Sequence, residues 1–163
     1  MGFETDMDEK ALLQEFVRQQ RGAVIEKARG IDDAAAAARL VPSLTTIVGV
    51  VNHLAGVERW WLRVNMAGES DVPLPWSKDD VDADFKAAGV TIDAAIADYL
   101  AAAEESDAVV AAHSLDDVAA RTNRHVGGHP SLRWILVHMV EETARHAGHV
   151  DILREQLDAK ANV

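Results

Sequence analysis

Cysteine is absent from the 163 residues of this chain. The absence excludes a disulfide framework, a thiolate metal site and a nucleophilic thiol that belongs to the protein itself. If the protein takes part in sulfur chemistry, the sulfur must therefore arrive on a small molecule.

Basic charge is also in short supply, because 16 Lys and Arg stand against 27 Asp and Glu and the net charge is −11. This balance argues against binding to nucleic acid or to an anionic membrane. No apolar run approaches the roughly 20 residues of a membrane-spanning helix. The first residues, MGFETDMDEK, contain no apolar stretch of a secretory signal. We therefore expect a cytoplasmic protein with neither a membrane nor a nucleic-acid partner.

Alternating patterns typical of β-strands are missing, and so are a glycine-rich phosphate loop and the nucleophile elbow of serine hydrolases. Hydrophobic residues instead recur with helical period. Long helices are expected over residues 8–28, 43–67, 91–112 and 131–157, the second with Ser43 as its N-cap. Shorter helical pieces are expected over 32–38 and 115–119, and the segments 69–80 and 114–130 are expected to be mostly loop.

The length suits one domain, and 48% hydrophobic with 26% charged residues is ordinary for a folded protein. Four antiparallel helices packed as a bundle are the economical solution for this pattern. We predict an all-α fold, a single domain over residues 1–163, with short extra helical turns in the loops.

Three polar residues lie within stretches that otherwise have the pattern of buried helix: His53, Glu142 and His146. Glu142 and His146 are four apart and share one helix face. His53 belongs to another helix, on a stripe with Val50 and Val57. Because carboxylates and imidazoles are costly to bury unpaired, a divalent metal would satisfy all three. The alternatives are a surface Glu–His pair and a hydrogen-bonded core histidine.

Two imidazoles and one carboxylate would leave a coordination position open for water or substrate. We expect zinc, with nickel or iron as alternatives that geometry would decide. His138 and His149 lie on or beside the same face, and are candidates for proton transfer or for hydrogen bonds to the ligands. Other histidines, His113, His125 and His129, are expected at the surface.

Several further residues have two readings. Gly56 within a helix indicates either tight helix packing or the close approach of another group. Trp76 lies in a proline-rich loop, where it could plug the core or cap a pocket, whereas Trp60, Trp61 and Trp134 are expected in the core. Arginines that could recognise an anionic substrate, or could simply be solvated, are Arg59, Arg63, Arg124 and Arg133.

The segments VNHLAGVERWW and SLRWILVHMVEETARHAGHVDILRE resemble the DinB-like superfamily of metalloenzymes. The chain is similar, over nearly its whole length, to the actinobacterial branch of small domains in that superfamily. Mycothiol-dependent maleylpyruvate isomerase and bacillithiol transferases belong to it as well. The resemblance implies an up-down-down-up four-helix bundle, often a homodimer. It also implies a metal held by a histidine of the second helix and two residues four apart on the fourth.

Many members carry a segment resembling HxxxHRGQ at the fourth helix. Here the register falls on Glu142 and His146, with AGH in place of RGQ. The implied ligands are therefore His53, Glu142 and His146, similar to the His–Glu–His set of the isomerase. That isomerase carries an additional C-terminal domain which these residues do not contain, so its particular reaction is not carried over.

The leading hypothesis for function is a metal-dependent enzyme. The ion would present a thiol such as mycothiol to a small electrophile for transfer or isomerisation. One alternative is a hydrolase in which the metal activates water, and another is a non-catalytic module that binds a metal or small ligand. A helical bundle whose polar cluster is satisfied without metal is the simplest reading.

Overall fold

The computed structural model describes residues 7–124 and 126–161, and within them the regular structure is helical. Long helices are α1 (Glu9–Ala28), α3 (Ile47–Glu58), α5 (Ile92–Ala111) and α6 (Leu132–Ala161); short ones are α2 (Asp33–Ala36) and α4 (Ala83–Lys86). Helix α3 continues directly into a π-helix, η1 (Arg59–Met66). Extended structure in the described residues is limited to two isolated β-bridges. The prediction of an all-α fold is confirmed.

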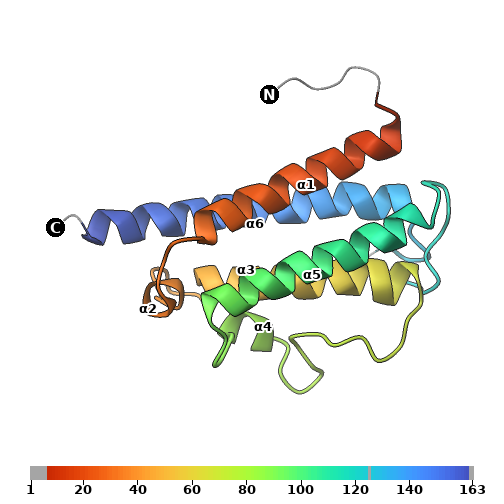
Figure 1. Cartoon of the computed structure of the whole chain (residues 1–163). Coiled ribbons are helices and arrows are strands. Elements are labelled where there is room, and N and C mark those ends of the chain that lie inside the picture. The colour runs from red at the N-terminus through yellow and green to blue at the C-terminus, as the bar shows by residue number, and fades with distance from the viewer. Residues whose placement is uncertain (1–6, 125, 162–163) are drawn as a thin grey trace.

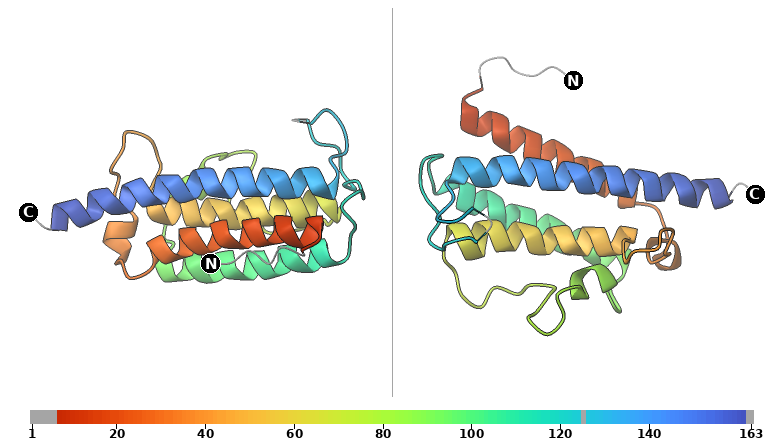
Figure 2. Two further views of the ribbon diagram at one scale, coloured as in Figure 1. Left: turned by 90° about the horizontal axis from the view of Figure 1, so that it is seen from above. Right: turned by 180° about the vertical axis from the view of Figure 1, so that it is seen from behind.

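The long helices lie lengthwise beside one another (Figures 1 and 2). α1 packs along α6, and α3 packs along α5, while α3 also contacts α6. In Figure 1, α1 runs toward the end that carries α2, α3 and α5 both run away from it, and α6 returns. The contact between α3 and α6 brings His53 opposite Glu142 and His146.

Side-chain caps begin three of the long helices. Asp8 accepts a hydrogen bond from the backbone N–H of Ala11 at 2.8 Å, and Thr91 caps α5 in the same way. The prediction that Ser43 is the N-cap is wrong. The hydroxyl of Thr46 caps α3 instead, by accepting a hydrogen bond from the Gly49 N–H at 3.1 Å. The Ser43 hydroxyl instead bonds within its own bend, to Thr45 at 2.9 Å.

Three local details differ from the sequence expectation. The last part of the second long helix is a π-helix, in which the side-chain amide of Asn65 also donates to the Trp60 carbonyl at 2.6 Å. Helix α4 was not predicted. Residues 115–119 form a turn and part of a bridge between Val118 and Ser131 rather than a helical turn. Contacts to distant segments hold two of these pieces: the Asn52 side chain donates to the Asp84 carbonyl in α4, and the Ala119 N–H donates to the Pro130 carbonyl at 2.8 Å.

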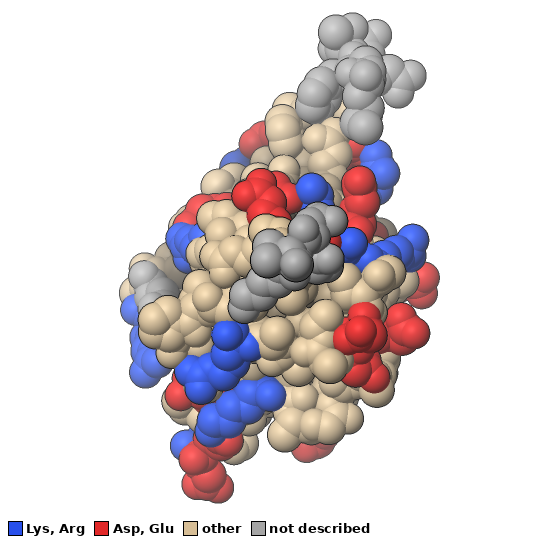
Figure 3. All heavy atoms as spheres, turned by 90° about the vertical axis from the view of Figure 1, so that its left-hand side faces the viewer, with Lys and Arg blue, Asp and Glu red and all other residues tan. Residues whose placement is uncertain are grey.

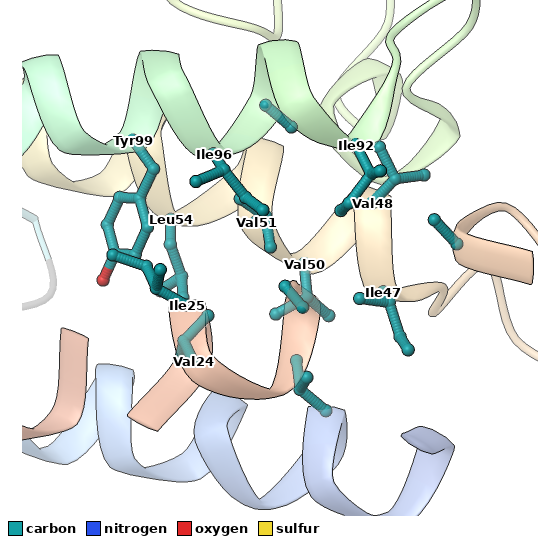
Figure 4. Close-up of a cluster of buried hydrophobic side chains, with 14 of the residues drawn as sticks. Val24, Ile25, Ile47, Val48, Val50, Val51, Leu54, Ile92, Ile96 and Tyr99 are labelled. Atoms are coloured by element: carbon teal, nitrogen blue, oxygen red, sulfur yellow. The ribbon is translucent and has the colours of Figure 1, made fainter. Parts of the chain in front are cut away.

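The core consists of two clusters of buried hydrophobic side chains. One lies where α1, α3 and α5 meet and includes Val24, Val50, Leu54, Ile96 and Tyr99 (Figure 4). The other joins η1 and the first half of α6 through residues such as Trp61, Leu132 and Met139. Trp61 is buried as predicted. The prediction that Trp60 and Trp134 also lie in the core is wrong, since they are 36% and 37% exposed.

A buried ion pair joins α1 to α3 at positions between the two core clusters. Arg21 holds Glu58 through two hydrogen bonds of 2.6 and 2.8 Å, and Glu58 is fully buried. Arg59 and Asp84 are buried as well. Figure 3 shows acidic and basic side chains both present at one end of the molecule. No described helix is long and apolar enough to cross a membrane.

Candidate metal centre

The three residues singled out in the sequence converge across the α3–α6 contact. One potential ligand atom from each of His53, Glu142 and His146 lies within 4.8 Å of the other two. His53 Nε2 is 3.4 Å and His146 Nε2 is 3.2 Å from the same oxygen, Glu142 Oε1. Two imidazole nitrogens therefore approach one carboxylate oxygen. The donor set suits a divalent ion, which makes the cluster a possible metal site.

The other nitrogen of each imidazole also has a partner. His53 Nδ1 lies 2.7 Å from Asp84 Oδ2, and His146 Nδ1 lies 3.4 Å from His149 Nδ1. Metal-binding histidines almost always engage their second nitrogen in this way, which fixes the ring and its tautomer. Both rings are thus held with Nε2 facing the cluster.

Asp84 comes from the short helix α4 and is 3% exposed. Its second oxygen accepts the backbone N–H of Phe85 at 2.8 Å, and its carbonyl accepts the side chain of Asn52 at 2.8 Å. Asn52 precedes His53 on α3, so the same stretch of helix anchors α4 and receives its carboxylate. Asp84 therefore orients His53 from a fixed position.

Aromatic rings enclose the cluster on the side of His53. Phe85 stacks on His53 with ring centroids 4.5 Å apart, and Trp76 lies at 6.2 Å. A methyl group at Gly56 would lie 2.3 Å from a ring atom of Trp76 and 2.6 Å from Pro75. The close-approach reading of Gly56 is thus the correct one: glycine lets the proline-rich loop pack directly on α3.

The geometry shifts the acid–base properties of the cluster. Hydrogen bonds from His146 and then from His53 hold the pKa of Glu142 well below its usual value. Burial alone would lower the pKa of His53, but its bonds to Asp84 and Glu142 outweigh burial and raise it. Burial in the first place, and then the nearby side chains of His146 and Arg145, lower the pKa of His149. Glu142 is therefore ionised and can act as an anionic ligand.

The remaining expected site residues lie apart from this convergence. His138 stacks on Trp134 at 5.2 Å and meets the edge of Trp61 at 4.7 Å. Its part in proton transfer stays a prediction. His113 and His129 each bond a backbone carbonyl, and His125 lies outside the described residues.

Three of the four candidate arginines are engaged by carboxylates. Arg59 binds Asp98 and Glu105, Arg63 binds Glu69 and Glu105, and Arg133 binds Glu9 and Asp116. These arginines hold the helices and loops together. Arg124 has no carboxylate partner among the described residues.

Sequence reasoning missed Asp84 and Phe85, because α4 is only four residues long and nothing in VDADFK sets its acidic residues apart. The site is therefore that of an all-helical protein with a His–Glu–His cluster between two facing helices. In agreement, residues 12–159 match the model of the family described as mycothiol-S-transferase, so the chain belongs to that family and to the DinB-like superfamily. No curated protein matches the chain.

Proposed function

We propose that the protein is a metal-dependent enzyme that transfers a low-molecular-weight thiol to a small electrophile, or isomerises such an electrophile with the thiol. The observation that carries the proposal is the approach of His53 Nε2 and His146 Nε2 to Glu142 Oε1. Membership of the mycothiol-S-transferase family supports mycothiol as the thiol. The absence of cysteine agrees with a thiol that arrives from outside.

The cluster fits a divalent cation. Two neutral imidazoles and one carboxylate match zinc, which we propose first, with nickel and iron as alternatives. When bound, the ion supplies positive charge that lowers the pKa of an incoming thiol, whose reference value is about 8.5. The ionised state of Glu142 supports this role, since ligands must be deprotonated to bind a metal.

Transfer requires that the thiol, with its pKa lowered, release its proton to water, that its sulfur form a bond to an electrophilic carbon, and that the leaving group depart with its electron pair. In isomerisation the thiol adds and is expelled again. The rings of Phe85 and Trp76 exclude water from the His53 side, which favours attack by sulfur over hydrolysis.

His149 acts as a positioning residue in this proposal. For His146 Nε2 to offer its lone pair, the ring must carry its proton on Nδ1, which then donates to Nδ1 of His149. His149 consequently holds its own proton on Nε2 and has no free lone pair to act as a base. A part for His138 in proton transfer is the weaker proposal, because its ring contacts Trp61 and Trp134.

The test combines metal analysis with turnover. We expect protein purified without chelator to contain about one divalent ion and to conjugate mycothiol to electrophiles such as an aryl halide above the uncatalysed rate. Glu141→Ala is the matched control, since Glu141 neighbours Glu142 but is 53% exposed and pairs with Arg145. Equal metal content in wild type and His53→Ala would remove His53 from the site, and metal-independent conjugation would refute the mechanism.

Hydrolysis and non-catalytic binding are the alternatives. Turnover without thiol would indicate hydrolysis, and stoichiometric binding without turnover would indicate a binding module. The proposal also includes one DinB-like domain over residues 1–163, with its long helices in the up-down-down-up bundle. The helix directions in Figure 1 support that bundle. A homodimer and a cytoplasmic location remain predictions from resemblance and composition.

A further inference from the structure

A large pocket lies beside the His–Glu–His cluster. Its volume is about 770 Å³, within the range of sites that take small organic molecules. Its lining comes from η1, the proline-rich loop and the loop before α6: Trp60, Asn65, Trp76, Arg121, Asn123 and Arg124. Trp76 belongs to both places, because its ring also lies 6.2 Å from His53. His53 and Trp60 are seven residues apart, about 10 Å along the helix.

The backbone of the loop before α6 is fixed against η1. The N–H of Arg121 donates to the Asn65 carbonyl at 3.1 Å, and the Arg121 guanidinium donates to the Glu69 carbonyl at 2.6 Å. The backbone N–H of Asn123 closes a tight turn by donating to the Gly128 carbonyl at 2.7 Å. Arg124 stands on that turn. Both arginines are thereby carried by an anchored segment at the pocket wall.

Arg121 and Arg124 differ from most arginines of this acidic chain, because no carboxylate of the described residues pairs with them. Most arginines of the described residues are paired with carboxylates: Arg18, Arg21, Arg59, Arg63, Arg133, Arg145 and Arg154. Those with no carboxylate partner in the described ranges are Arg29, Arg39, Arg121 and Arg124. Two of these four line the same pocket. Guanidinium groups left without a carboxylate in a protein of net charge −11 are suited to an anion that comes from outside.

We infer that this pocket binds a small organic anion, with its carboxylate or phosphate at Arg121 and Arg124 and its flat apolar body against Trp60 and Trp76. The indoles offer stacking surface, and the guanidiniums offer paired donors. Resting on the proposed function, the anion is the electrophile, held so that its far end reaches past Trp76 to the metal cluster. The substrate class is thus an electrophile with one oxyanion on an aromatic or planar body.

The experiment compares two probes that differ by one charge, 4-nitrobenzoate and 4-nitrobenzamide, titrated into the zinc-loaded protein. Binding is followed by calorimetry and by quenching of tryptophan fluorescence. We expect the acid to bind at least about tenfold more tightly than the amide, and Arg124→Gln to remove that preference. Arg29→Gln is the matched control, an unpaired arginine that does not line the pocket, and should keep it. 4-Nitrophenyl phosphate in a parallel titration distinguishes phosphate from carboxylate.

Equal affinity for acid and amide, or unchanged preference in Arg124→Gln, would overturn the inference. Displacement of nitrobenzoate by mycothiol would overturn it too, because the pocket would then hold the thiol. Failure here in a protein that still binds zinc and mycothiol counts against the pocket alone. Binding of nitrobenzoate by a protein that takes up no zinc supports the pocket and counts against the proposed function alone.

Discussion

Two polar groupings interrupt the apolar interior of this protein, and they are built differently. At Arg21 and Glu58, both carboxylate oxygens accept a guanidinium N–H at 2.6 and 2.8 Å, and Arg21 also donates to Asp107 at 2.8 Å, so these charges are satisfied among themselves. At the His–Glu–His cluster, two imidazole nitrogens share one oxygen at 3.2 and 3.4 Å. The Arg21–Glu58 grouping therefore needs no further ligand. In the second, two imidazole nitrogens and one carboxylate oxygen, which are all atoms able to bind a cation, converge from two helices.

The largest effect is expected from breaking the Arg21–Glu58 pair. Glu58→Ala leaves the charged Arg21 side chain, which is 10% exposed, with only the more exposed Asp107 as a carboxylate partner, which should cost about 3 kcal/mol of unfolding free energy. Urea unfolding measures the loss, while zinc stoichiometry should stay unchanged. Replacing both partners, Arg21→Met with Glu58→Leu, should recover much of the stability. Loss of zinc in well-folded Glu58→Ala would contradict the separation of the two groupings.

Removing a residue of the His–Glu–His cluster should lower zinc affinity strongly and the unfolding free energy only a little. Glu142→Ala or His146→Ala is expected to weaken zinc binding by more than about 100-fold, beyond the loss typical of outer partners. The unfolding free energy of the metal-free protein should fall less than in Glu58→Ala. Competition with a chromophoric chelator gives the affinity, and Glu141→Ala serves as the control. Zinc affinity within threefold of wild type would show that the convergence is only structural.

A smaller loss is expected from the partner behind His53. Asp84→Asn keeps the size of the side chain but weakens its hold on His53 Nδ1, and zinc affinity should fall by about 10–100-fold. Asp82→Asn, on the same short segment but without a bond to the cluster in the described structure, is the comparison variant. If both variants bind zinc equally well, Asp84 does not orient the ring.

The smallest effect concerns pH. Because the pKa of His53 is raised, its protonated form competes with the metal, and zinc affinity should fall as pH drops below that pKa, by at most about tenfold per pH unit for one proton. The Arg21–Glu58 pair should not respond between pH 6 and 8, since Glu58 raises the pKa of Arg21 despite burial. Chelator competition and urea unfolding at both pH values test this contrast.

Prediction from sequence worked where chemistry and helical period coincide. The long helices and the face shared by Glu142 and His146 follow from residue spacing. The resemblance to the DinB-like superfamily added support for His53, on another helix, and the three residues do converge. Trp60 shows where that reasoning fails: helical period places it on the stripe of His53, yet it lies in η1 and lines the pocket. Periodicity assumes a regular α-helix, and a π-helix changes the angle between successive residues.

Residue order by itself determined the helices and the face shared by Glu142 and His146, two members of the His53, Glu142 and His146 trio, because hydrophobic period and four-residue spacing are properties of a single segment. Only the tertiary structure decided which residues support and surround that trio. Asp84 is 31 positions from its partner His53, and Arg121 meets η1 across a long stretch of chain. Such contacts depend on how loops return to the helices. No local pattern predicts how the loops return. The hydrogen bond between His53 and Asp84, the packing of Phe85 and Trp76 around His53, and the pocket lined by Arg121 and Arg124 are therefore visible only in the folded chain.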